Sequence, residues 1–209
     1  MALCEEQGLS FFLARAKVLL GWALAEEGRI EDGLAQIHEG IAGYRATGAE
    51  AEMPYWLSLL AHAQGRAGQP EEGLRTLAEA MQRVRQSGVR ICEAELHRLR
   101  GELLLQQAVP KNQEGGCGLP DSAAIDARVM TEAEACFRDA IEIARQQQAK
   151  SLELRAVTSL SRLLGRQGRR DEACKMLTEA YGWFTEGLDT ADLREASALL
   201  QELAHEPRT

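Results

Sequence analysis

Arginine side chains recur at helical spacing in the second half of this acidic chain, and their characteristic chemistry is the binding of anions. Arg155, Arg162 and Arg166 are separated by seven and four residues, so a single helix would present all three on the same side. A guanidinium group holds a carboxylate through two parallel hydrogen bonds. The pattern therefore suggests an acidic peptide or a chain terminus as ligand. The alternative is a solvated face on which salt bridges such as Glu95–Arg98 neutralise the arginines.

Residue patterns that would support catalysis or metal binding are not found in the sequence. Its histidines are scattered, and nothing in their spacing places one beside a nucleophile: His38, His62, His97 and His205. The five cysteines include no Cys-x-x-Cys motif. The glycine-rich stretch 115–118 lacks the Lys-Ser/Thr that completes a phosphate-binding loop. We therefore expect no enzyme activity, no metal and no cofactor, and a self-standing enzyme is the remaining alternative.

The composition indicates an all-helical protein that binds neither nucleic acid nor membranes. The chain has 209 residues, of which only 5% are aromatic, and it is rich in the strong helix formers Ala, Leu, Glu, Gln and Arg. Its net charge of −8 excludes a nucleic-acid binder that relies on bulk charge. The most apolar segment, 11–24, is interrupted by Arg15 and Lys17, so we expect no membrane segment. Five scattered cysteines, taken as reduced thiols, favour a cytoplasmic location.

A repeat of 40 residues organises the chain. GRIEDGL at 28–34 recurs as GQPEEGL at 68–74, and GRRDEAC at 168–174 follows the same pattern. TEAEACF at 131–137 supplies the missing copy once the Gly- and Pro-rich segment 108–130, which we expect to form a loop, is treated as an insert. The predicted organisation is a helix tail of a preceding repeat at 1–8, repeats at 9–48, 49–88, 89–148 and 149–188, and a capping helix at 189–205. A short lead-in at 1–8 is the alternative.

Each repeat is predicted to contain two helices, A and B, that approach each other through small residues. The recurring pattern is large–small–large in helix A and small–bulky–small in helix B, which in the first repeat are Leu20, Gly21, Leu24, Gly33, Ile37 and Gly40. Apolar positions three or four apart are typical of helices. Gly28, Gly68 and Gly168 are expected to end the A helices in a left-handed conformation. Trp56 and Trp183 are expected in the core.

Further signals mark the start of one helix and the two ends of the array. Thr131 and Glu134 have the spacing of a capping box that would open the third helix B. The final helix is expected to cap the array through an apolar side formed by Leu193, Ala196, Leu200 and Leu203. At the other end, the apolar residues Leu9, Phe11 and Phe12 suggest that the chain can form a homodimer.

This pattern resembles the tetratricopeptide repeat (TPR), although the usual period is about 34 residues and the usual Trp and Tyr of helix A are mostly absent here. The resemblance implies an all-α fold, a right-handed superhelical array of about four antiparallel helix pairs with a C-terminal capping helix. It also implies an inner groove, lined by the A helices, that binds a protein or peptide. The groove residues predicted in this way are Trp22, Tyr55, His62, Arg66, Arg98, Arg155, Arg162 and Arg166.

Two segments of the chain resemble the repeats of a narrower group of proteins. Residues 133–163 and 181–203 are similar to the C-terminal repeats of multidomain bacterial adenylate or guanylate cyclases that also carry a signal-transduction ATPase domain. The resemblance implies a regulatory module without catalytic activity, whose partner is a peptide or a neighbouring domain. A sensor that binds an anionic small molecule is the alternative.

Overall fold

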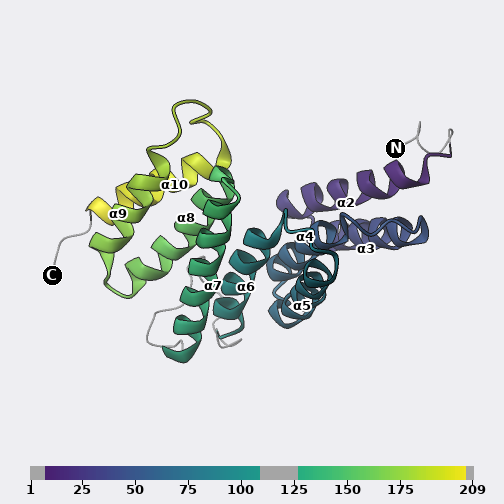
Figure 1. Cartoon of the computed structure of the whole chain (residues 1–209), viewed down its shortest axis with the longest axis horizontal. Helices are drawn as coiled ribbons and strands as arrows, with labels where there is room; N and C mark the ends of the chain where they lie inside the picture. The colour runs from purple at the N-terminus through teal and green to yellow at the C-terminus, as the bar shows by residue number, and fades with distance from the viewer. Residues whose placement is uncertain (1–7, 109–126, 206–209) are drawn as a thin grey trace. The chain divides into compact units, whose positions relative to one another are not determined.

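The computed structural model describes residues 8–108 and 127–205, and all regular structure in these ranges is α-helical. The helices are labelled in Figure 1: α2 (Ser10–Glu26), α3 (Ile30–Ala46), α4 (Met53–Arg66), α5 (Pro70–Ser87), α6 (Glu93–Gln107), α7 (Ala127–Gln146), α8 (Lys150–Arg166), α9 (Arg170–Tyr181) and α10 (Ala191–His205). The chain divides into two compact units, one ending at Leu99 and one beginning at Arg100. The all-α prediction is confirmed.

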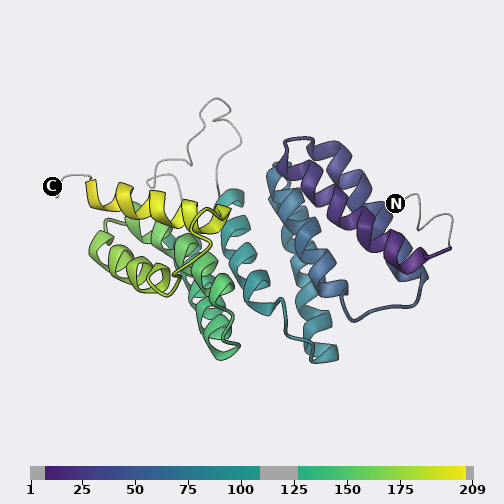
Figure 2. The same cartoon turned by 90° about the horizontal axis from the view of Figure 1, so that it is seen from above.

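In the N-terminal unit, consecutive helices pack as hairpins. The helix α2 lies along α3, α4 packs against both of them, and α5 pairs with α4 (Figure 2). The bulky position of helix B is filled by Ile37 in α3 and Leu77 in α5, and both side chains are fully buried. Trp56 is 2% exposed, so its predicted core position is confirmed.

Glycines allow α2 and α3 to approach closely, as the repeat pattern predicts. A Cβ atom on Gly21 would lie only 2.6 Å from the carbonyl oxygen of Gly33. One on Gly40 would meet the backbone nitrogen of Val18 at 2.7 Å. Such separations are shorter than any van der Waals contact, so a side chain at either position would push the two helices apart.

The turns between helices A and B repeat the same geometry. Gly28, Gly68 and Gly168 have φ angles of 89°, 69° and 77°, which confirms their predicted left-handed conformation. In each turn, the amide after the glycine donates to a carbonyl five residues earlier, at 2.9 Å: Arg29 to Leu24, Gln69 to Gln64 and Arg169 to Leu164. Each bond satisfies a carbonyl at the helix end.

The C-terminal unit has a continuous apolar core between α7, α8, α9 and α10. Phe137 of α7 occupies the bulky position of its repeat and lies 2.6 Å from where a Cβ on Gly101 would stand. The helix α10 covers α8 and α9, burying Leu193, Ala196 and Leu203 as predicted. In the last turns of α10, Leu199 is buried more deeply than Leu200, the leucine that was predicted to face the core.

Three sequence expectations are wrong in detail. Residues 127–130, expected in the insert, form the first turn of α7, while residues 109–126 of that insert and 1–7 of the predicted helix tail lie outside the described residues. Thr131 is therefore inside α7, where its hydroxyl donates to the carbonyl of Ala127 at 2.9 Å instead of capping the helix. Trp183 is 60% exposed, because α9 ends at Tyr181 and the tryptophan falls in the following turn.

Candidate functional site

The predicted groove residues lie on A helices of both units. The N-terminal unit contains Trp22, Tyr55, His62, Arg66 and Arg98, and the C-terminal unit contains Arg155, Arg162 and Arg166.

In the N-terminal unit, Arg66 and His62 converge on the end of α2. The Arg66 guanidinium donates through Nε to the carbonyl of Ala25 at 3.1 Å and through Nη2 to the carbonyl of Glu26 at 3.3 Å. Its Nη1 lies 3.6 Å from Oε2 of Glu26, and Nδ1 of His62 lies 3.7 Å from Oε1 of the same carboxylate. A cation at this position satisfies the last carbonyls of a helix and favours its dipole. Arg66 therefore serves to join α2 to α4.

Two aromatic side chains are exposed on the same pair of helices. Trp22 lies one helical turn before Glu26, and Tyr55 lies two turns before His62. Tyr55 packs on Trp56 with ring centroids 4.9 Å apart, and its own ring remains 43% exposed. A rigid, partly exposed aromatic side chain is a typical contact residue of a protein interface.

Arg98 does not present its charge to solvent. Its side chain is buried, and its Nε and Nη2 atoms donate to the two oxygens of Glu95 at 2.9 and 2.7 Å. This is the salt bridge that the alternative interpretation of the arginines predicts. Arg98 is therefore not part of the candidate site.

In the C-terminal unit, α10 supplies carboxylates to the arginines of α8. Nη2 of Arg162 donates to Oε1 of Glu195 at 2.6 Å. Nε of Arg155 lies 4.0 Å from Oδ2 of Asp192. These partly exposed pairs join α8 to the capping helix and contribute little stability individually. They also neutralise two of the three predicted arginines.

Arg166 is the predicted arginine whose charge is least compensated. Its side chain is half-buried, and no hydrogen bond or ion pair joins its guanidinium to any residue that the structure describes. The pKa of Arg166 is lowered, mainly by burial of its side chain. The positive charge of Arg162 lowers this pKa further, while the carboxylate of Glu202 acts to raise it. A partly buried cation next to a second cation is a favourable place for a bound anion.

Arg166 lines two hollows. One, of about 210 Å³, is bounded by α6, α7 and α8 and includes Leu105, Phe137 and Leu163. The other, of about 420 Å³, is bounded by α8, α9 and α10 and includes Arg170 and Glu202. Arg162 and Arg166 line both hollows. The candidate site is therefore an arginine pair that lines two hollows, each of which has both polar and apolar residues in its wall.

Ser159, and its hydrogen bond to Glu102, is a feature of the smaller hollow that the sequence did not predict. Oγ of Ser159 donates to Oε1 of Glu102 at 2.8 Å, and both residues line the smaller hollow. The register places Glu102 in the same inward helix-A position as Trp22, His62 and Arg162. A carboxylate beside the arginines would also favour ligands that carry both charges.

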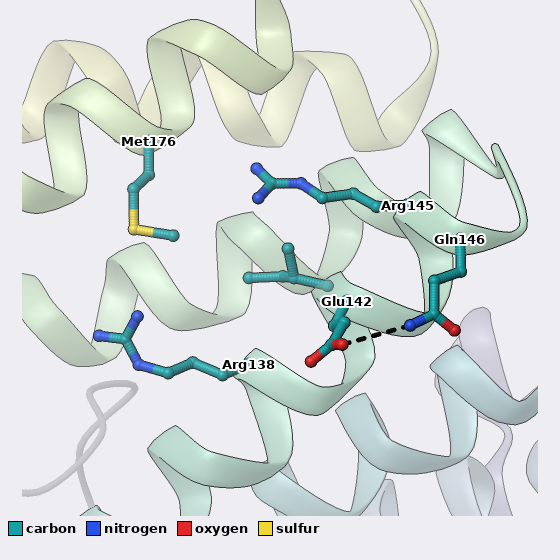
Figure 3. Close-up of a pocket in the computed structure, with 6 residues that line it drawn as sticks. Arg138, Glu142, Arg145, Gln146 and Met176 are labelled. Atoms are coloured by element: carbon teal, nitrogen blue, oxygen red, sulfur yellow. Dashed lines mark hydrogen bonds between the residues drawn. The ribbon is translucent and has the colours of Figure 1, made fainter.

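A third hollow, of about 410 Å³, lies between the B helices α7 and α9 (Figure 3). Its two arginines already have carboxylate partners, because Arg138 pairs with Glu134 and Glu172 and Arg145 pairs with Glu153. Figure 3 shows the Gln146 amide turned to Glu142, to which it donates at 3.2 Å. This hollow therefore offers a ligand no arginine without a carboxylate partner.

The described residues contain no group of three His, Cys, Asp or Glu side chains placed to hold a metal ion. The described part of the chain also lacks a helix with the length and apolar character needed to cross a bilayer.

Comparisons with known proteins show the fold. The chain matches two solved structures of a protein described as a kinesin light chain with nearly identical TPR-like repeats, from Podosopora anserina, one of them a variant. The TM-scores are 0.61 and 0.59 at 12% and 13% identity, and each match covers 90% of this chain and 84% of the other. The chain therefore has a TPR-like helical-repeat fold.

At the level of sequence, no protein-family model matches the chain. It is 32% identical over 143 residues to an uncharacterised protein of Rhizobium meliloti (strain 1021). The match covers 68% of this chain and spans only 12% of the length of that protein.

Proposed function

We propose that this chain is a non-catalytic interaction module that binds an acidic segment of a partner protein on its A helices. The observation that carries the proposal is Arg166, a half-buried cation that lines two hollows and has no hydrogen-bonded or ion-paired partner in the described residues. TPR-like folds generally mediate protein–protein contacts, which supports a protein partner. The side chain of the bound segment would pack against Leu105 and Phe137 while its carboxylate meets Arg166.

We further propose a regulatory setting for this interaction. The resemblance of residues 133–163 and 181–203 to the C-terminal repeats of bacterial cyclase–ATPase proteins supports a module that biases a tethered catalytic domain in the cytoplasm. The match to a small part of a much longer Rhizobium protein is consistent with that setting. The exposed rings of Trp22 and Tyr55 would provide a separate apolar contact in the N-terminal unit.

The test is the binding of a fluorescein-labelled peptide of alternating leucine and glutamate with a free C-terminal carboxylate, followed by fluorescence anisotropy. A charge-assisted hydrogen bond contributes about 1.5–3 kcal/mol, so Arg166→Gln should weaken binding by roughly 10- to 100-fold. Arg194→Gln is the matched control, because Arg194 is an exposed arginine of the same unit on α10. Equal affinity in the wild type and both variants would reject the proposed site.

A sensor for an anionic small molecule is the second candidate, favoured by the polar hollow of about 420 Å³ that Arg166 shares with Arg170. Citrate is a suitable probe in a thermal-shift measurement. Stabilisation by citrate that Arg166→Gln abolishes, without any peptide binding, would support the sensor. Peptide binding that citrate does not displace would support the protein partner.

A further inference from the structure

The smaller hollow beside α8 contains side chains of both charges. Arg162 and Arg166 contribute the positive charges, and Glu102 of α6 contributes a negative one. Glu102 is half-buried, and its Oε1 atom accepts the hydrogen bond from Oγ of Ser159 at 2.8 Å. A carboxylate in the wall of an anion site offers a partner to a cationic group on the ligand. The hollow can therefore hold both charges of a zwitterion.

The two charges lie close together along α8. Ser159, to which Glu102 is bonded, lies seven residues before Arg166, which is about 10 Å along the helix axis. Side chains on a helix lean toward its N-terminus, so the Arg166 guanidinium reaches back toward Ser159. Its pKa is lowered in part by the charge of Arg162, which lies between them. The anionic and cationic groups of the ligand therefore belong to one small molecule.

The rest of the hollow sets the size and polarity of that molecule. Its wall includes the buried side chains of Leu105, Phe137 and Leu163. The volume of about 210 Å³ is below the range of roughly 300–1,000 Å³ that is typical of pockets for drug-sized ligands. A ligand of this size would gain affinity by burying an apolar side chain.

We propose that this hollow binds a free α-amino acid with an aliphatic side chain. The ligand carboxylate would meet Arg166, its ammonium group would meet Glu102, and its side chain would pack on Phe137. A carboxylate has about four acceptor positions, so Glu102 can bind the ammonium group and still accept from Ser159. The inference goes beyond the proposed binding of an acidic segment, because it requires Glu102 as a second charged contact. The two ligands share Arg166 and should compete.

Isothermal titration calorimetry of the full chain with three related ligands tests the proposal. L-leucine carries both charges, isocaproate lacks the amino group, and isoamylamine lacks the carboxylate. Leucine should bind with a dissociation constant of roughly 10 µM to 1 mM. Each truncated ligand should bind about 10- to 100-fold more weakly, because it loses one charge-assisted contact. No leucine binding at about 10 mM, or equal binding of leucine and isocaproate, would overturn the proposal.

Glu102→Gln tests the role of the carboxylate, because glutamine keeps the shape and can still accept from Ser159. This variant should bind leucine about 10- to 100-fold more weakly than the wild type does and should bind isocaproate equally well. Glu179→Gln is the matched control, since Glu179 is exposed on α9 and lines neither hollow at Arg166. Equal weakening of both ligands by Glu102→Gln would contradict the proposed contact. The comparison of ligands on the wild type stands even if this variant fails to fold.

The failure of this inference can be distinguished from the failure of the proposed function. Arg166→Gln should weaken the binding of both leucine and the leucine–glutamate peptide, whereas Glu102→Gln should weaken the binding of leucine alone. Leucine binding without peptide binding would uphold the amino-acid site and reject the acidic segment as ligand. Peptide binding without leucine binding would reject the amino-acid site and leave the proposed function in place.

Discussion

The carbonyl oxygens of Gly21 and Gly33 each lie 2.6 Å from the position that a Cβ atom on the other glycine would occupy. The backbones of α2 and α3 are therefore in direct contact at this point, and the contact is reciprocal. Because neither glycine can be replaced without moving a helix, this pair fixes the distance between the two helices of the first repeat.

Replacing either glycine by alanine should destabilise the N-terminal unit. Overpacking of this kind costs about 1–3 kcal/mol, although the higher helix propensity of alanine offsets up to about 1 kcal/mol of it. Urea unfolding followed by circular dichroism would measure the change. Gly43→Ala in the same helix as Gly33 is the control, because its Cβ would approach Ala14 only to 3.3 Å and the variant should be nearly neutral.

Replacing Gln148 by glycine should stabilise the protein. Gln148 has a φ of 55°, while the equivalent positions of the first two repeats hold Gly48 and Gly88 at 76° and 71°. A non-glycine residue in the left-handed region costs roughly 1 kcal/mol, so Gln148→Gly should raise the free energy of unfolding by about 0.5–1 kcal/mol. The reverse change, Gly88→Gln, should lower it by a similar amount. A loss of stability in Gln148→Gly would contradict this account of the turn.

Glu153 should make stability depend on acid pH. Burial alone would raise the pKa of Glu153, but hydrogen bonds from Arg145 at 2.6 Å and Lys150 at 2.8 Å outweigh it and lower the pKa below its ordinary 4.5. The stabilisation is therefore present above about pH 4.5 and is lost as the pH falls through the lowered value. At pH 7, Glu153→Gln should cost about 1–3 kcal/mol.

At about pH 3, the wild type and Glu153→Gln should differ much less in unfolding free energy, because Glu153 of the wild type also loses its charge there. Glu142→Gln is the control, since the Glu142 side chain is exposed and, within the part of the chain that the structure describes, accepts a hydrogen bond from the Gln146 amide alone. That variant should change stability by less than about 0.5 kcal/mol at either pH. A difference for Glu153→Gln that does not shrink on acidification would refute the ion-pair explanation.

The three cysteines in the described residues should differ in how fast they react with iodoacetamide. Burial is the main cause that raises the pKa of Cys92 to about 11, and burial also raises the pKa of Cys136. Only the thiolate reacts with iodoacetamide, so at pH 8 Cys92 should be modified roughly a hundredfold more slowly than an ordinary thiol. Cys174, which is partly exposed, is the internal reference. Mass spectrometry of digests, with a urea-unfolded sample in which the difference disappears, gives the measurement.

The helical repeat could be predicted because its signals are local. Gly28, Gly68 and Gly168 mark the turns, since a left-handed conformation strongly favours glycine, and Ile37 and Leu77 mark the bulky side of helix B. The period of these signals in the sequence is the period of the structure. No long-range information was needed to find it.

The burial of each arginine and the carboxylate with which it pairs could not be predicted from local signals. Arg162 bonds to Glu195, 33 residues away, and Arg98 is buried against Glu95 in its own helix, although both occupy predicted groove positions. Which carboxylate neutralises an arginine depends on the packing of neighbouring helices and on rotamers. Trp183 was misplaced because its exposure follows from the end of α9 at Tyr181, directly before Gly182, and the prediction extended the helix beyond that glycine.

The identical turns after α2, α4 and α8 have a consequence for how such a chain can change in length. Each turn carries its own geometry within a few residues, so a whole forty-residue unit could be duplicated or deleted in the gene without altering the junctions on either side. Recombination in multiples of that unit would leave reading frame, helix direction and hydrogen bonding intact. Genes for this architecture can therefore gain or lose whole repeats without disrupting the packing of the repeats that remain.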